Sequence, residues 1–290
     1  MSKSKNFLLW TITVFITVSA MFYQRMTGPT YPKKVSAVLA GQEYNFKLLR
    51  SNEIGTPCDI NLDAEDSDLE ATIYFKRYKV DEPWKEVKMQ RKTSHKKAFF
   101  GEGDKTGILT ATLPEQPSAG KVEYHIDIYK NNQKTSIAAD DPVVVRFKGF
   151  VPRSVLIPHV LFMILSLFIG TRAGIEAIFK GDKTFKFTRI TLIAFGIGGL
   201  ILGPIVQKYA FGELWTGWPF GGDWTDNKTI FAWLFWLVAF FVLRKKPKNR
   251  VWPVIAMLVL FAMYMIPHSM GGSELDNETG KIETGVREQY

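Results

Sequence analysis

The sequence predicts a membrane protein of mixed α+β type, in which an exported immunoglobulin- or fibronectin-like β-sandwich precedes a four-helix transmembrane bundle. An N-terminal signal anchor brings the predicted number of spans to five. Only 46% of the 290 residues are hydrophobic, yet the apolar residues are concentrated in five runs. Lysine and arginine gather in two of the connections between those runs, and the long segment after the first run alternates apolar and polar residues.

Residues 1–23 form the first predicted element. Lys3 and Lys5 precede the apolar run Phe7–Phe22, and this order is typical of a signal peptide or a signal anchor. Residues 18–20, "VSA", could serve as a cleavage site, so both alternatives stay open at this point. The apolar character continues beyond that site, which favours an uncleaved anchor. Either alternative exports the segment that follows.

Residues 24–150 are predicted to be the exported β-sandwich. In "VEYHIDIY" at 122–129 the apolar and polar residues alternate, as expected for a half-buried strand, and "NN" at 131–132 favours a hairpin turn. Seven or so short strands in this length favour a sandwich, and this likeness of architecture carries no function. The other clear strand candidates are 43–50, 70–79, 108–113 and 142–148. The single cysteine, Cys58, excludes an intramolecular disulfide and is expected to be a small buried thiol.

Residues 151–267 are predicted to be the four-helix membrane domain. Each of its apolar runs has 15 to 17 residues without a charged side chain, which is slightly short of the ~20 residues that cross a bilayer as a helix. Flanking aromatic and basic residues can extend each span into the interfaces. The four runs are 155–171, 190–206, 229–243 and 251–267.

The distribution of basic residues predicts the orientation. The 172–189 and 244–250 loops carry five basic residues each, whereas the 208–228 loop carries only Lys208 and Lys228. Because short cytoplasmic loops are enriched in lysine and arginine, we expect a bacterial-type inner-membrane protein with a cytoplasmic N-terminus. The β domain and the polar external tail, 268–290, then lie outside the cytoplasm. The net charge of +9 largely reflects this topology and does not indicate a nucleic-acid-binding protein.

Two histidines are the main candidate site residues. His159 and His268 both follow an Ile-Pro dipeptide, and the predicted topology places both at the external interface. The external loop between spans three and four is rich in tryptophan. It is expected either to form an aromatic belt, with Asp226 or Thr225 capping span four, or to fold over the helix ends. In the second alternative it would bring supporting residues near the histidines, namely Glu213, Trp218, Asp223 and Asp226.

Such a site could hold one of several cofactors. Paired histidines on facing helices can bind the iron of haem b, and histidines with carboxylates can bind a divalent metal. A histidine beside a carboxylate can also bind a quinone head group or transfer a proton. The sequence contains no CxxCH or HExxH motif, so the choice between these cofactors stays open.

Two further features are expected to be structural. Arg172 and Glu176, four residues apart, are expected to continue the second span into an inner interfacial helix, with binding of a lipid phosphate by Arg172 as the alternative. Gly196, Gly199 and Gly203 are expected to form a small-residue face for close helix packing.

The function expected from this organisation is that of a non-enzymatic binding or assembly component of an envelope complex. Its partners would be the lipid bilayer and a protein that binds the exported domain, which has no evident catalytic constellation. The first alternative is a redox subunit that binds b-type haem or quinone through His159 and His268. The second is a metal-dependent membrane hydrolase at the same face.

Overall fold

The computed structural model describes residues 2–97, 102–267 and 272–284, and it has a mixed α+β fold. The chain divides into two compact units. The helical unit comprises residues 1–29, 150–273 and 283–290, and the β unit comprises residues 30–149 and 274–282.

The helical unit contains the predicted apolar runs. Among the described residues, four helices are long and apolar enough to cross a membrane, while the fifth apolar helix has only 15 residues. The four long helices imply a lipid environment. The elements are α1 (Lys3–Thr27), α2 (Arg153–Ile178), α3 (Thr184–Phe195), η1 (Gly196–Leu202), α4 (Gly203–Phe211), α5 (Trp224–Lys245) and α6 (Val251–Met265).

The helix ends follow from local chemistry. At the start of α1, the Lys5 backbone N–H donates a hydrogen bond to the Ser2 hydroxyl over 3.2 Å, and this is an N-cap. At the end of α4, Gly212 adopts a φ of 92°, which favours glycine and ends the helix. The second span starts at Arg153, earlier than the apolar run alone suggested, so Pro158 lies inside α2.

The third span contains a π-helical segment, η1, within its glycine-rich stretch. A Cβ atom on Gly199 would lie 2.7 Å from the Thr229 Cγ2 atom of α5. A Cβ atom on Gly198 would lie 3.0 Å from the Phe162 Cβ atom of α2. Gly198 and Gly199 therefore allow the third span to approach both neighbouring helices closely. Gly199 belongs to the predicted small-residue face, whereas Gly198 does not, and a Cβ atom on Gly203 would meet only ordinary contacts of 3.6 Å or more.

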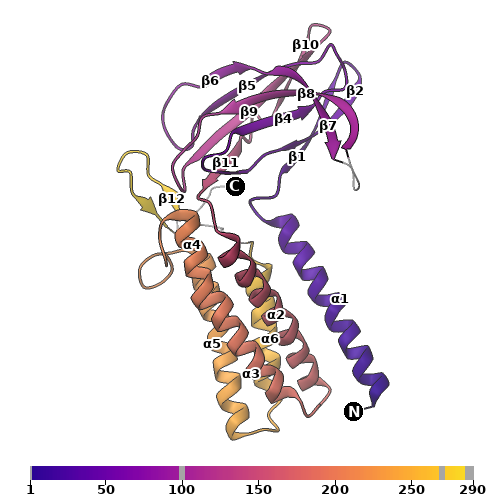
Figure 1. The fold of residues 1–290 in the computed structure, drawn as a ribbon, viewed down its shortest axis with the longest axis vertical. Helices are drawn as coiled ribbons and strands as arrows, with labels where there is room; N and C mark the ends of the chain where they lie inside the picture. Colours follow the sequence, from indigo (N-terminus) through magenta and orange to yellow (C-terminus); the bar gives the residue numbers. More distant parts are fainter. Residues whose placement is uncertain (1, 98–101, 268–271, 285–290) are drawn as a thin grey trace. The chain divides into compact units, whose positions relative to one another are not determined.

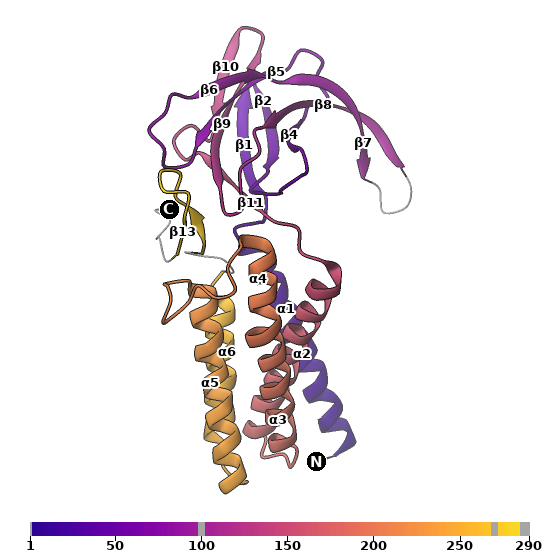
Figure 2. The same cartoon turned by 60° about the vertical axis from the view of Figure 1, so that its left-hand side comes forward.

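The connections of the helical unit lie at two opposite ends. In Figures 1 and 2, the N-terminal end of α1 lies at the same end as the α2–α3 and α5–α6 connections. The start of α2, the loop between α4 and α5, and the end of α6 lie at the other end. The two basic loops therefore share one end and the tryptophan-rich loop occupies the opposite end.

The β unit consists of short antiparallel strands and one parallel pair. Its strands are β1 (Lys33–Leu39), β2 (Gln42–Leu48), β3 (Ser51–Glu53), β4 (Cys58–Asp63), β5 (Glu70–Arg77), β6 (Lys85–Lys88), β7 (Gln90–Lys97), β8 (Glu102–Leu113), β9 (Lys121–Lys130), β10 (Gln133–Ile137) and β11 (Val143–Lys148). The larger sheet has the order β3-β11-β9-β5-β6, with β10 paired to β9. A three-stranded sheet has the order β4-β8-β7, and β1 pairs with β2.

One hydrophobic core lies between these sheets. Its members on strands come from β1, β2, β4, β5, β8, β9, β10 and β11. The alternation predicted for 122–129 is confirmed, because Tyr124 and Ile126 are fully buried. The hairpin turn is also confirmed, since Asn131 and Asn132 have φ values of 51° and 59° between paired strands.

Cys58 is buried, as predicted, and burial raises the pKa of its thiol to about 12. The immunoglobulin-like assignment stays a prediction.

The segment 274–282, expected to be part of a polar external tail, belongs to the β unit. It contains β12 (Glu274–Leu275) and the start of β13 (Ile282–Glu283). The Glu274 carboxylate lies 2.9 Å from the Lys79 ammonium group and 2.8 Å from that of Lys121. Burial raises the pKa of Glu274, but the hydrogen bonds from both lysines outweigh it, so the net shift lowers the pKa. These ion pairs fix the segment to the β unit.

Candidate functional site

The two aspartates of the tryptophan-rich loop hold that loop in place. Asp226 Oδ2 accepts hydrogen bonds from the backbone N–H groups of Thr216 (2.7 Å) and Gly217 (3.0 Å). Asp223 Oδ1 accepts one from the Thr225 N–H over 2.7 Å and is the N-cap of α5. Both carboxylates are 5% exposed. The predicted cap therefore exists, but the assignment of Asp226 or Thr225 as the capping residue was wrong.

Lys228 ties the start of α5 to the end of α6. Its side chain is buried, and Nζ donates hydrogen bonds to the carbonyl oxygens of Ile266 (2.7 Å) and Pro267 (3.4 Å). The carbonyl groups at a helix C-terminus lack partners within the helix, so a lysine is well suited to this position. The Ile-Pro dipeptide that precedes His268 is therefore held beside the first turns of α5. His268 itself lies outside the described residues.

His159 joins α2 to the π-helical segment. Its Nδ1 atom lies 2.9 Å from the carbonyl oxygen of Gly198, which also accepts the Gly203 N–H. Because a carbonyl oxygen can only accept, Nδ1 carries the hydrogen, and in the neutral ring Nε2 then keeps its lone pair. This hydrogen bond gives His159 a structural role within the helical unit.

The four predicted supporting residues differ in their exposure and in their hydrogen bonds. Glu213 is exposed and Trp218 is 71% exposed. Asp223 and Asp226 make no hydrogen bond or ion pair with His159. Within residues 2–97, 102–267 and 272–284, no three histidine, cysteine, aspartate or glutamate side chains are grouped as they would be to hold a metal ion.

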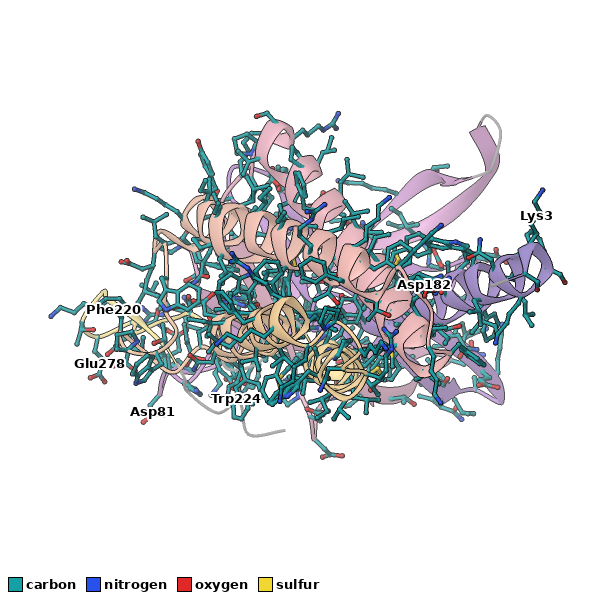
Figure 3. All side chains as sticks on the ribbon, turned by 90° about the horizontal axis from the view of Figure 1, so that it is seen from below. Lys3, Asp81, Asp182, Phe220, Trp224 and Glu278 are labelled. Atoms are coloured by element: carbon teal, nitrogen blue, oxygen red, sulfur yellow. The ribbon has the colours of Figure 1, made fainter. Side chains whose placement is uncertain are left out.

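The tryptophan-rich loop has a strongly exposed aromatic surface. Phe220 is 82% exposed and Trp224 is 50% exposed. Figure 3 labels both side chains, Phe220 within the loop and Trp224 at the start of α5. Aromatic residues at the ends of membrane-spanning helices are typical of the membrane interface. Buried aspartates together with exposed aromatic residues therefore favour an interfacial belt for this loop.

A buried ion pair lies at the opposite end of the helical unit. The side chains of Arg172 and Glu176, both on α2, are 0% and 2% exposed, and the guanidinium Nη1 lies 2.5 Å from the carboxylate. Glu176 also accepts a hydrogen bond from the Lys183 backbone N–H over 3.2 Å, in the α2–α3 connection that Asp182 marks in Figure 3. The expected i, i+4 pair is therefore present, but it is interior. A lipid phosphate is excluded as the partner of Arg172, because the side chain has no exposed surface.

An aromatic cluster lies on the outward side of the larger sheet of the β unit. We call it the aromatic face and define it by Tyr74 on β5, Trp84 before β6, and His125 on β9. The Tyr74 and His125 rings are stacked with centroids 5.0 Å apart, and the Trp84 ring meets His125 edge-on at 4.7 Å. The Lys76 ammonium lies 5.1 Å from the centre of the Trp84 ring and 3.4 Å from the carboxylate of Glu123.

His125 shows how this face differs from an ordinary solvated strand face. It lies on the outward side of β9 and pairs across the strands with Tyr74. It is only half-exposed, however, and its Nδ1 atom is buried without a hydrogen-bond partner among the described residues. Burial lowers the pKa of His125, and this effect outweighs the nearby Asp127 charge. Sequence reasoning missed the cluster because Trp84 lies outside any regular alternation.

Comparison of the sequence with models of known protein families and with curated proteins finds no match.

Proposed function

We propose that this protein is a membrane-anchored, non-enzymatic binding component of an envelope complex. The helical unit holds it in a bacterial-type inner membrane, with the two basic loops in the cytoplasm. The β unit faces the outside and binds a protein partner. The four helices that are long and apolar enough to cross a membrane support the anchoring part of this proposal. The charge asymmetry of the loops supports the orientation.

The aromatic face is the observation that carries the binding role. Tryptophan and tyrosine are enriched where protein interfaces gain most of their binding energy, and such positions are surrounded by polar residues that exclude water. Trp84 is 38% exposed, so part of its ring is available to a partner. Paired charges surround the cluster: Lys76 lies beside Glu123, and Lys134 lies 2.7 Å from the Asp127 carboxylate. Charges already paired on their own surface add little repulsion to an approaching partner.

The test compares two tryptophan substitutions in the full chain. We expect Trp84→Ala to reduce recovery of bound partner proteins at least about tenfold, because loss of a central aromatic side chain typically costs ~2 kcal/mol of binding. Trp224→Ala is the matched control, since Trp224 is exposed but belongs to the helical unit. Partners are cross-linked in intact cells, recovered from detergent extracts through a C-terminal tag, and quantified by mass spectrometry.

The outcome depends on the difference between the two variants. Proteins lost with Trp84→Ala and retained with Trp224→Ala would support docking through the aromatic face. Equal recovery with the wild type and with Trp84→Ala would contradict it. Circular dichroism of both variants checks that the β unit remains folded.

We propose haem or quinone binding at His159 as a second candidate function. The hydrogen bond from His159 Nδ1 to the Gly198 carbonyl favours it, because histidine ligands commonly donate their other ring N–H in this way. His268 would supply the second ligand. If the candidate is right, protein purified from a haem-replete host absorbs in the Soret region, and His159→Ala removes that absorption. A colourless wild-type sample would exclude haem and leave quinone to be tested by extraction.

A further inference from the structure

The buried arginine of α2 depends on the N-terminal helix for its surroundings. The Arg172 Nη2 group donates a hydrogen bond to Asn6 Oδ1 of α1 over 3.0 Å. The guanidinium carbon lies 5.1 Å from the centre of the Trp10 ring and 5.3 Å from that of Phe187. The charge therefore lies beside an aromatic ring of α1 and one of α3, which also contact each other edge-on with centroids 5.7 Å apart. Such cation–π contacts strengthen when the cation is removed from water.

The buried residues of α1 form one continuous stripe. Leu9, Thr13, Thr17 and Ala20 are all less than 9% exposed, and their spacing places them on one face of the helix. Thr13 donates its hydroxyl to the Leu9 carbonyl over 2.7 Å, so it needs no other partner. Three of the four side chains are small, as is usual where helices approach closely in a membrane.

A second contact fixes the other end of α1. The Gln24 amide donates a hydrogen bond to the carbonyl oxygen of Tyr264, near the end of α6, over 3.4 Å. The helix runs without interruption through Ala20 to Thr27. Residues on both sides of the possible cleavage site therefore contact the other helices of the helical unit. Cleavage after Ala20 would separate Gln24 from the residues that surround Arg172.

We infer that α1 is a permanent span of the mature protein, locked to the helical unit by the buried guanidinium group of Arg172. Loss of α1 would remove Asn6 and Trp10 together and expose a charged group in a lipid environment. Charged side chains inside membrane proteins are costly unless they are paired and enclosed. Because α1 helps to enclose the Arg172 guanidinium group, α1 is part of the folded protein.

The direct test is the intact mass of the full chain purified through a C-terminal tag. We expect a mass that includes residues 2–27, with or without Met1. A mature chain that begins at Met21 overturns the inference, whether or not the released helix copurifies.

A second test addresses the lock itself. We expect Trp10→Ala and Asn6→Ala each to lower the midpoint of thermal unfolding in detergent by about 3–5 °C, the shift that loss of one or two kcal/mol gives in a domain of this size. Phe15→Ala is the control, because Phe15 lies on α1 and is 73% exposed. In an Arg172→Ala background, Asn6→Ala should cause little further change, since the two side chains act as one unit. If Trp10→Ala and Asn6→Ala match Phe15→Ala, the proposed lock does not exist.

Discussion

Replacement of Arg172 by alanine is expected to destabilise the helical unit by about 3–5 kcal/mol. Its side chain and that of Glu176 are 0% and 2% exposed, so the substitution leaves a buried carboxylate without its counter-ion. Removal of one partner of a buried pair destabilises a protein by more than the pair itself stabilises it. The remaining charge is then buried away from water and has no counter-ion. The chain can be unfolded in mixed micelles by titration with sodium dodecyl sulfate and followed by tryptophan fluorescence.

Two further variants separate the charge from the packing. Arg189→Ala removes an exposed arginine from α3 and should change stability by less than about 0.5 kcal/mol. The double variant Arg172→Leu/Glu176→Leu removes both charges and should be more stable than Arg172→Ala, because no isolated buried charge remains. An Arg172→Ala protein as stable as Arg189→Ala would show that the ion pair is not enclosed as described.

Phe147→Ala is expected to destabilise the β unit by about 3–5 kcal/mol. Phe147 lies on β11, between β3 and β9 in the larger sheet, and its side chain is fully buried in the core. Truncation would remove its apolar contacts and leave a cavity that the surrounding strands cannot fill. Because a typical domain is stable by only about 5–15 kcal/mol, the change would remove a large part of the total.

Hydrogen exchange measured by mass spectrometry would localise this effect. Peptides from β9 and β11 should exchange on the order of 10²- to 10³-fold faster in Phe147→Ala, because exchange of core amides reports the free energy of opening. Phe150→Ala is the matched control, since Phe150 lies three residues further along and is 61% exposed. Protection of the helical unit should not change in either variant. Unchanged protection of β9 in Phe147→Ala would show that Phe147 does not pack in the core.

The hydrogen-bond partner of His159 could not be predicted from the residues next to it in the sequence. Its Ile-Pro context was visible, but the partner of its ring, the Gly198 carbonyl, lies 39 residues away in a π-helical segment. Glycine spacing predicted close packing there and did not predict the change of helical type. The roles of Asp223 and Asp226 could not be predicted either, because both carboxylates accept hydrogen bonds from backbone N–H groups that are positioned only when the loop folds.

The sequence by itself determined the helical runs, the alternating strand 122–129 and the Asn131–Asn132 turn, because each depends on residues only a few positions apart. The tertiary structure alone decided that Arg172 is enclosed by Asn6, 166 residues distant, and that 274–282 joins the β unit. Apolar periodicity shows which face of an element is buried, and it does not show which distant side chain that face meets. Partners of buried charges are therefore fixed only when the elements pack together.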